Sequence, residues 1–202
     1  MMDGVASRSD LTPQKEKLYL TKKIVAVDMD DTILYLMKAI MEDHNAKFPD
    51  HLVAYENMIA FDDSMLHPEY NKIDYFNTPG TFFNLNPIDN YVIDELKKIN
   101  DKYDLVIVTS AFPRSVNDKW RWVQHHLPFL PFSNFITAGR KDLIQADILI
   151  DDAQHNVEKW VKTGRPALVP EHHWNKDLGL LPGVTMFGSW KGLTEKIDDI
   201  LS

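Results

Sequence analysis

The amino-acid sequence predicts an α/β protein with a Rossmann-like parallel sheet flanked by helices, and a small, mostly helical cap inserted after the first strand. Short runs of apolar, largely β-branched residues alternate along the chain with stretches of helical periodicity, which is typical of parallel strands joined by crossover helices. Acidic or hydroxyl residues directly follow three of these runs. Because the carboxyl ends of parallel strands share one edge of a sheet, we expect these polar residues to meet there and form the functional site.

The first strand is the apolar run at residues 24–27, which suits a central strand buried on both faces. It leads directly into Asp28, Asp30, Asp31 and Thr32. Carboxylates this close together repel one another, and a hard cation with oxygen ligands, most simply Mg²⁺, would compensate their charge. Asp and Thr also favour turns and helix N-caps. The ordered polar clusters downstream favour the cation site over a turn alone.

The remaining elements follow from apolar periodicity and from the positions of proline and glycine. We expect further strands at 105–108, 135–137, 148–150, 167–169 and 184–187, and helices at 32–48, 87–103, 115–127, 155–162 and 193–201. In the helix at 115–127, Trp120 and Trp122 cannot both face the core. We expect Trp120 to be packed and Trp122 to be partly exposed.

The expected domain organisation has three parts. Residues 1–20 mix charge and polarity and are expected to form a flexible N-terminal extension. Residues 21–35 and 87–202 form the α/β core. Residues 36–86 form the cap, because periodicity is lost after residue 49 while aromatic residues remain frequent. Short helices and loops lying over the active site are expected there, and an ordinary satellite core of aromatic rings is the alternative.

Composition argues against several classes of protein. The chain has 202 residues, of which 44% are hydrophobic and 26% charged, as in ordinary globular domains. A net charge of −8 argues against a nucleic-acid partner, which would require a basic face. The chain has no cysteine, so it can form neither a disulfide nor a thiolate metal site. No apolar run is long enough to span a membrane and the first twenty residues contain no signal-peptide core, so we expect no membrane partner and a cytoplasmic location.

The histidine pairs at 125–126 and 172–173 are not expected to bind zinc. Adjacent side chains on a helix point in different directions, and no carboxylate-bearing ligand motif accompanies either pair. We expect both pairs to lie at the surface near helix ends.

The polar clusters have the side chains that phosphoryl transfer requires. A carboxylate at Asp28 can act as a nucleophile and form an acyl-phosphate, and Asp30 can act on the same substrate as general acid and then base. Thr109 and Ser110 follow the second strand and can donate hydrogen bonds to phosphoryl oxygens. Lys141 can neutralise charge on the phosphoryl group and on the nucleophile.

The metal site is expected where the strand at 148–150 ends. Asp151, together with Asp28 and the backbone carbonyl of Asp30, can hold Mg²⁺, which usually keeps several waters and one substrate oxygen. Because Asp151 follows a strand of the same parallel sheet, we expect it to lie at the same edge as Asp28, the candidate nucleophile.

Four motifs carry a resemblance to a known superfamily. The sequence Asp-Met-Asp-Asp-Thr at 28–32 resembles the DxDxT first motif of the haloacid dehalogenase (HAD) superfamily. Val-Thr-Ser at 108–110 resembles its second motif, Lys141 its third and Ile-Asp-Asp at 150–152 its fourth. The superfamily consists mainly of Mg²⁺-dependent phosphatases, and members with the second Asp, here Asp30, are phosphotransferases rather than dehalogenases.

Further segments resemble the 5′(3′)-deoxyribonucleotidases, over roughly residues 24–175. They are the stretches at 79–87, 118–123 and 146–152. The resemblance implies a homodimer and a cap that places apolar and aromatic residues against the base. By position, Leu36, Phe61 and Phe76 are the candidates for this base pocket.

The resemblance also implies phosphate contacts and marks three departures from the family pattern. Lys119 matches a family lysine near the phosphate, and Arg114 is a second candidate for that contact. Leu36 stands where the family usually has an aromatic residue, and Asp31 where it favours a small one. Residues 153–156 replace the Arg-Pro turn that often follows the fourth motif.

The sequence therefore predicts a Mg²⁺-dependent phosphohydrolase that removes phosphate from (deoxy)nucleoside monophosphates through an aspartyl-phosphate intermediate. The alternatives are a HAD phosphatase for another small phosphoester such as a sugar phosphate, a non-catalytic nucleotide-binding regulator, and a phosphatase that processes nucleic-acid ends. The intact set of candidate catalytic residues argues against a regulator without activity.

Overall fold

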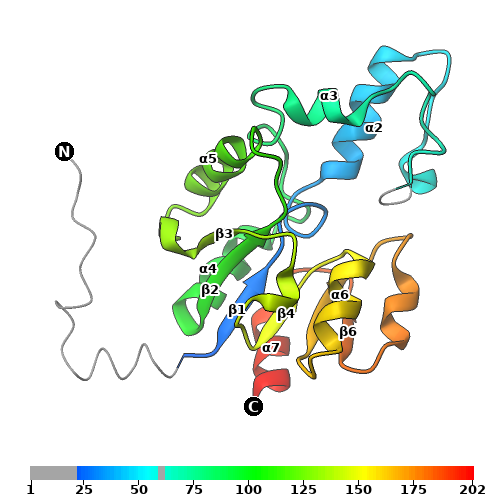
Figure 1. Cartoon of the computed structure of the whole chain (residues 1–202). Coiled ribbons are helices and arrows are strands. Elements are labelled where there is room, and N and C mark those ends of the chain that lie inside the picture. The colour runs from blue at the N-terminus through cyan, green and yellow to red at the C-terminus, as the bar shows by residue number, and fades with distance from the viewer. Residues whose placement is uncertain (1–21, 59–61) are drawn as a thin grey trace, which may run out of the picture.

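The computed structural model describes residues 22–58 and 62–202. Its centre is a six-stranded sheet in which all neighbouring strands are parallel. The strands are β1 (Ile24–Val27), β2 (Asp104–Thr109), β3 (Phe135–Thr137), β4 (Ile148–Ile150), β5 (Ala167–Pro170) and β6 (Val184–Phe187). Their order is β3-β2-β1-β4-β5-β6 (Figure 1), the order of the Rossmann fold. The predicted fold class is confirmed, whereas the expected N-terminal extension lies outside the described residues.

Helices connect the strands and cover both faces of the sheet. The α-helices are α2 (Leu36–Lys47), α3 (Lys72–Asn77), α4 (Val92–Lys102), α5 (Val116–His126), α6 (Gln154–Val161) and α7 (Leu193–Leu201). Short 3-10 turns are η2 (Tyr55–Asn57), η3 (Phe132–Asn134), η4 (Lys141–Leu143) and η5 (Lys176–Leu180). None of the helices in this part of the chain combines the length and the apolar character needed to cross a membrane.

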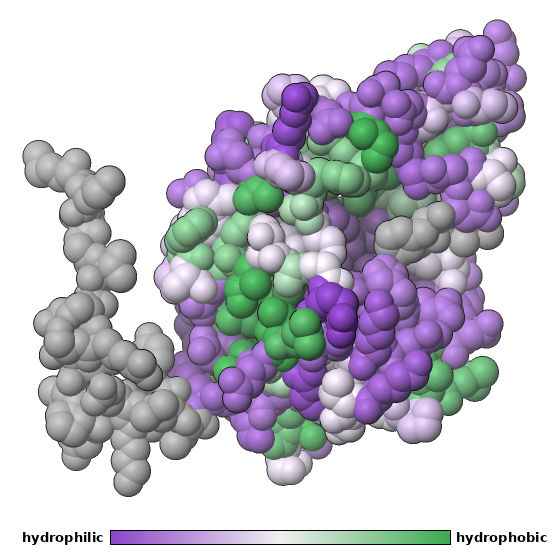
Figure 2. Space-filling view, in the orientation of Figure 1, coloured by the Kyte–Doolittle hydropathy of each residue, from purple (hydrophilic) through white to green (hydrophobic). Residues whose placement is uncertain are grey.

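The hydrophobic core has two layers, one on each face of the sheet. Val25 and Val27 of β1 belong to the cluster that includes apolar residues of α4, α5 and α7, while Ala26 belongs to the cluster that includes α6. This alternation follows from the two-residue period of a strand, and burial on both faces explains why β1 is apolar throughout. Figure 1 shows α4 and α7 on one side of the sheet and α6 on the other. The surface in Figure 2 is mainly hydrophilic, with smaller hydrophobic patches.

The strand order places a crevice between the carboxyl ends of β1 and β4. The chain leaves β1 towards β2 and β3 on one side, and β4 leads to β5 and β6 on the other. Val27 pairs with Ile150, and the amide of Asp28 donates to the carbonyl of Ile150 at 2.9 Å. Residues that directly follow the two strands therefore lie side by side at the point where ligands bind in folds of this type.

The segment at 36–86 contains α2, η2 and α3 and, in its described part, no strand of the sheet. α2 and α3 lie beyond the carboxyl ends of the strands (Figure 1). The chain enters this segment near residue 35 and returns to the sheet region near residue 86. These two connections, the chain crossings, run next to each other. The amide of Tyr35 donates to the carbonyl of Asn86, and the amide of Ile88 to that of Ile33, both at 3.0 Å. The two backbone connections of the segment are therefore bonded to each other.

Two predicted helices begin later than expected. The helix expected from residue 32 begins at Leu36 because the preceding residues form a tight turn, in which Asp31 has a φ of 51°. The helix expected from residue 87 begins at Val92 because Pro87 pairs with Leu34 in an isolated bridge. In both cases hydrogen bonds between the two chain crossings outweigh local helix propensity.

For the two tryptophans of α5, Trp120 is packed against the core as expected, but the expectation that Trp122 is partly exposed is wrong. Trp122 is fully buried, and its indole N–H donates to the carbonyl of Leu85 at 2.8 Å. Trp120 is half-buried against the rings of Phe132 and Phe135. The face of α5 that carries Trp122 packs against the end of the inserted segment, a contact that helical periodicity alone does not reveal.

We predict that Trp122→Ala lowers the free energy of unfolding by about 3–5 kcal/mol, because it leaves a large cavity in the core. It also leaves the carbonyl of Leu85 without its indole donor. Trp120→Ala is the matched control and should cost clearly less, because solvent already reaches part of that ring. Urea denaturation of both variants measures the difference, and equal losses would contradict this account of the core.

Candidate active site

A buried ammonium group joins the ends of β1 and β4. Lys141, the first residue of η4, is 2% exposed, and its Nζ lies 2.6 Å from Asp28 Oδ1 and 2.7 Å from Asp151 Oδ2. Burial by itself would lower the pKa of Lys141, but the charges of Asp151 and Asp28 outweigh burial and raise this pKa above its ordinary value. Lys141 is therefore charged, and it holds the two carboxylates close together.

Asp151 is fixed by further hydrogen bonds. Its carboxylate accepts from the amide of Ala153 at 2.9 Å and from Asn156 Nδ2 at 3.1 Å. Burial raises the pKa of Asp151 to about 6, although the charge of Lys141 opposes the increase. The side chain consequently has a single defined orientation towards Asp28.

Three carboxylates at this edge fit a divalent cation. Oxygen atoms of Asp28, Asp151 and Asp152 all lie within 4.8 Å of one another, and all three residues are buried. Burial and repulsion from neighbouring aspartates, Asp31 first among them, raise the pKa of Asp152 well above its ordinary value. A buried cluster of hard oxygen donors that lacks enough positive charge is suited to a cation such as Mg²⁺. We therefore take these residues as the candidate metal site.

The metal set predicted from the sequence differs from this cluster in one residue. Asp28 and Asp151 belong to both sets. The third member of the predicted set is Asp30, through its backbone carbonyl, whereas the third member of the cluster is Asp152. Asp152 was not predicted. It directly follows Asp151 at the end of β4, and the Asp-Asp pair in the sequence was the available indication. Thr32 holds it in place, since the Thr32 hydroxyl donates to Asp152 Oδ1 and accepts from the Asp152 amide, both at 3.1 Å.

Lys119 of α5 contacts Asp30. Its Nζ lies 2.5 Å from Asp30 Oδ2, 2.9 Å from Thr109 Oγ1 and 2.8 Å from the carbonyl oxygen of Ser110. An ammonium group has three hydrogens, and these three acceptors use all of them. We therefore expect Lys119, predicted to bind phosphate, to act mainly through Asp30. The pKa of Asp30 is raised by burial, an effect that Lys119 partly offsets.

The two hydroxyl residues after β2 differ in whether their hydroxyl groups can reach a ligand. Thr109 is fully buried and bonded to Lys119. Ser110 is exposed and borders the cavities next to Asp30, where its hydroxyl makes one long hydrogen bond, 3.4 Å to the carbonyl of Ala138. Ser110 is thus the better placed of the two to donate to a ligand. Arg114 is exposed and is not among the residues that border either cavity.

Two adjoining cavities of about 340 Å³ each open beside the carboxylates. One contains Asp28 and Lys141, the other contains Lys119 and Phe82, and they share Asp30, Leu36, Phe76, Ser110 and Phe112. Both therefore combine charged residues with an apolar wall.

The structure brings two of the three predicted base-pocket residues to this apolar wall. Leu36 opens α2 and Phe76 lies on α3, while Phe61 lies outside the described residues. Phe112 was not predicted. Its ring stacks on that of Phe76 with centroids 5.7 Å apart and planes 25° apart, although it comes from the loop between β2 and α5. A single exposed Phe in a loop gives no sequence pattern by which to find it.

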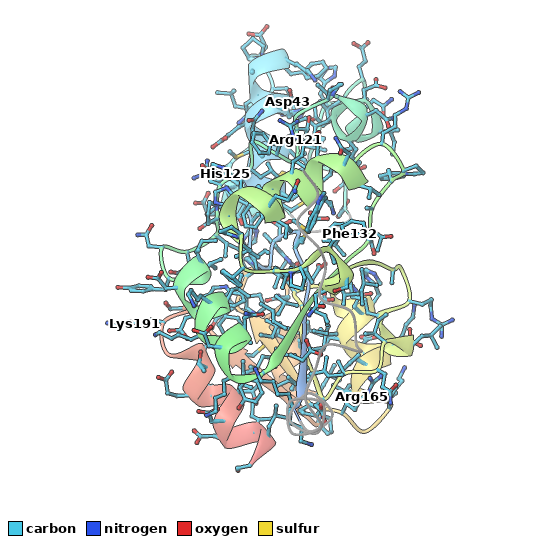
Figure 3. All side chains as sticks on the ribbon, turned by 90° about the vertical axis from the view of Figure 1, so that its left-hand side faces the viewer. Asp43, Arg121, His125, Phe132, Arg165 and Lys191 are labelled. Atoms are coloured by element: carbon cyan, nitrogen blue, oxygen red, sulfur yellow. The ribbon has the colours of Figure 1, made fainter. Side chains whose placement is uncertain are left out.

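The histidine pairs were expected at the surface, and this expectation is only partly met. Figure 3 labels His125 and Arg121 on α5, and both residues are exposed. Within the described ranges, the group of possible metal ligands is the aspartate cluster, and it includes no histidine. His172, however, is mostly buried rather than at the surface, and its imidazole bonds to the carbonyl of Asp31.

Solved structures show first which fold the chain shares. The chain matches a HAD family hydrolase from Deinococcus radiodurans, solved with phosphate and sodium bound, with a TM-score of 0.65 and 11% identity over 89% of this chain and 96% of that chain. It matches the HAD-hydrolase-type protein YfnB of Bacillus subtilis, solved with magnesium bound, with a TM-score of 0.57 and 14% identity over 88% and 99% of the two chains. At these identities the likeness is one of fold, which is that of the HAD superfamily.

Sequence comparisons then define the family. The model of the family described as "5' nucleotidase, deoxy (Pyrimidine), cytosolic type C protein" matches residues 22–178. The 5′(3′)-deoxyribonucleotidase of Bacillus subtilis (strain 168) is 33% identical over 147 residues, which is 69% of this chain and 81% of the relative. The same figures hold for the 5′(3′)-deoxyribonucleotidase of Bacillus phage SPbeta. The chain belongs to this 5′-nucleotidase family and is a phosphoric monoester hydrolase, which confirms the predicted resemblance.

We predict that Mg²⁺ stabilises the folded chain through the three carboxylates. At about 100 times its Kd, a cation that binds only the folded state adds about 2.7 kcal/mol of stability. For a chain of this size, that raises Tm by about 5–10 °C. Asp152→Asn should remove most of this increase, because it takes away one charged ligand.

Differential scanning calorimetry with and without Mg²⁺ measures the effect. Asp177→Asn is the matched control, since Asp177 is exposed and lies outside the cluster. An equal Mg²⁺-dependent increase in wild type and Asp152→Asn would exclude Asp152 from the metal site.

Proposed function

We propose that this enzyme hydrolyses deoxyribonucleoside monophosphates with the help of Mg²⁺, through a covalent aspartyl-phosphate on Asp28. The observation that carries the proposal is the position of Asp28. Its carboxylate is held by the ammonium of Lys141 at 2.6 Å, and it borders a cavity that is also lined by the stacked rings of Phe76 and Phe112. A phosphate group and a planar base can therefore be bound in one continuous space.

The first half of the reaction uses both carboxylates of the loop after β1. Asp28 attacks phosphorus, so an acyl-phosphate bond forms while the bond between phosphorus and the sugar oxygen breaks. Protonated Asp30 gives its proton to that leaving oxygen. Burial raises the pKa of Asp30, which favours the protonated form needed at this step.

The second half regenerates the enzyme. The carboxylate of Asp30, now ionised, takes a proton from a water molecule as that water bonds to phosphorus. The bond between phosphorus and Asp28 breaks, and inorganic phosphate leaves. Lys119, at 2.5 Å from Asp30, keeps the carboxylate in place through both proton transfers.

The charge on the transferring group is balanced by residues at the sheet edge. Lys141 neutralises negative charge that develops beside Asp28, and Ser110 can donate to a phosphoryl oxygen. Mg²⁺, held by Asp28, Asp151 and Asp152, would supply further positive charge and polarise a phosphoryl oxygen when bound. The expected contribution of the Asp30 carbonyl to the metal remains part of this proposal.

The substrate class is inferred from the wall of the cavities and from the relatives. The relatives from Bacillus subtilis and Bacillus phage SPbeta are named 5′(3′)-deoxyribonucleotidases. An aromatic wall of Phe76, Phe82 and Phe112 is suited to a base. A sugar phosphate would leave this wall without a partner, so it is the second candidate. Nucleic acid is not expected as a substrate, given the net charge of −8. A cytoplasmic location and a homodimer stay predictions from the sequence and the family.

We predict that Asp28→Asn lowers phosphate release from dUMP, dTMP or dGMP by at least about 1,000-fold, because an amide cannot form the acyl-phosphate. Chelation of Mg²⁺ should abolish the wild-type activity. Circular dichroism should show an unchanged fold, and the exposed residue Asp177 supplies the control variant Asp177→Asn with full activity. Retained turnover in Asp28→Asn would refute the covalent mechanism.

We predict that Phe112→Ala raises KM for deoxyribonucleoside monophosphates by about 5- to 100-fold, since stacking on one base contributes about 1–3 kcal/mol. KM for deoxyribose 5-phosphate, which has no base, should change less than about twofold. Phe132→Ala is the matched control, because Phe132 is exposed and does not border either cavity. Activity on the sugar phosphate alone would keep the mechanism and refute the base pocket.

A further inference from the structure

The residues at 29–34, which we call the Asp31 turn, connect the candidate nucleophile to the inserted segment. The turn is closed by short-range bonds. The carbonyl of Met29 accepts from the amides of Ile33 and Leu34 at 2.9 and 3.1 Å, and the amide of Asp31 donates to the carbonyl of Leu34 at 2.8 Å. Asp31 adopts a φ of 51°, a left-handed conformation that costs free energy in a residue other than glycine. Such a turn requires support from its surroundings.

Two side chains from the far half of the sheet provide that support. Nε2 of His172 donates to the carbonyl of Asp31 at 2.6 Å, and Nε1 of Trp190 donates to the carbonyl of Thr32 at 3.1 Å. His172 follows β5 and Trp190 follows β6. Both bonds link positions more than 140 residues apart in the sequence, and neither donor belongs to the proposed catalytic machinery.

Both donors are held in fixed orientations. The imidazole of His172 stacks on the indole of Trp174, with centroids 4.3 Å apart and planes 10° apart. The amide of His172 donates to Asn175 Oδ1 at 2.8 Å, and Asn175 Nδ2 donates to the carbonyl of Asp152 at 3.1 Å. Trp190 is 1% exposed, and its amide donates to Asp89 Oδ2 at 3.1 Å. The two bonds therefore join the turn to a rigid surface.

The polar side chains of the turn bond to the reaction site and to the inserted segment. Asp30 pairs with Lys119, and Thr32 binds the carboxylate and amide of Asp152. The carboxylate of Asp31 accepts from the amides of Leu36 and Met37 at 3.1 and 3.0 Å, so it caps the first helix of the inserted segment. A displacement of this backbone would move the proposed general acid and disturb the Thr32 contact that holds a candidate metal ligand.

We propose that His172 and Trp190 are positioning residues, which hold the Asp31 turn by its carbonyl groups and thereby orient Asp30 for proton transfer. The proposal rests on the assignment of Asp30 in the proposed function. Loss of either donor leaves a carbonyl without its partner and releases the strained turn. The effect is expected on kcat rather than on KM, because neither donor borders the cavities that would bind phosphate and base.

The test compares variants that remove the donor with variants that keep it. His172→Leu and Trp190→Phe should lower kcat for dUMP or dTMP by about tenfold or more, with KM unchanged within about twofold. His172→Gln keeps an N–H donor and should recover most of the lost activity. Hydrogen exchange of the amides at 31–37 should become about tenfold faster in His172→Leu and Trp190→Phe than in wild type.

The neighbouring residues supply matched controls. Nε1 of Trp174 is buried without a hydrogen-bond partner in the described part of the chain, so Trp174→Phe removes an indole N–H that holds nothing and keeps an aromatic ring to stack on His172. His173 is exposed and bonds to the carbonyl of Met58 instead of the Asp31 turn, so His173→Leu controls for the loss of an imidazole. Both controls should keep kcat and the amide exchange of wild type.

Wild-type kcat and amide exchange in folded His172→Leu and Trp190→Phe would overturn the proposal. An equal loss in His172→Leu and His172→Gln would also overturn it, because packing of the ring, and not the hydrogen bond, would then be responsible. If wild type releases no phosphate from any nucleotide, the proposed function fails, and the exchange measurement alone decides whether the two residues hold the turn.

Discussion

The buried ion pairs of Lys141 are the interaction on which the site depends. Asp28 and Asp151 end adjacent strands, so the sheet itself forces two carboxylates together in a region of low solvent access. Without a cation between them their repulsion would separate the two strand ends or protonate one of them. Lys141 comes from the connection after β3, so three separate connections of the sheet converge on one ammonium group. A charge buried in this way is costly unless all its partners are in place, which makes the geometry of Asp28 a property of the whole sheet.

The two buried lysines contact different carboxylates of the site. Lys141 contacts Asp28 and Asp151, while Lys119 contacts Asp30 and uses its remaining hydrogens on Thr109 and Ser110. The Asp30 side chain is 24% exposed against 8% for Asp28. In the proposed reaction, the more accessible carboxylate is the one that exchanges a proton with substrate and water. The less accessible one needs only a defined direction towards phosphorus, which the ammonium of Lys141 supplies.

Most of the sheet could be predicted from the sequence, because its information is local. The first strand at 24–27 and the strand at 148–150 coincide with the predicted runs. A strand buried on both faces must be apolar at every position, and a polar cluster marks its end. From these strand ends, the meeting of Asp28, Lys141 and Asp151 also followed, since parallel topology fixes which ends share an edge.

The features that the sequence did not reveal depend on contacts between distant segments. Leu36, and not Thr32, begins α2 because the preceding residues bond to the second chain crossing and to loops after β5 and β6. Trp122 is buried because the end of the inserted segment packs on it. Phe112 belongs to the cavity wall because Phe76, from another segment, stacks on it. In each case a partner far away in the sequence determines the outcome.

The cavity wall has a consequence for how substrate recognition and chemistry are connected. The charged residues of the cavities come from the sheet edge, whereas Leu36 and Phe76 come from the inserted segment. Under the proposed function, phosphate would bind at the sheet edge, and a base would stack against Phe76 only when the inserted segment is correctly oriented. That orientation depends on the carboxylate of Asp31, which accepts from the first two amides of α2. The Asp31 carboxylate next to the proposed general acid would thus set the wall against which the base rests, whereas the bonds of His172 and Trp190 to the carbonyls of the turn would orient Asp30 for proton transfer.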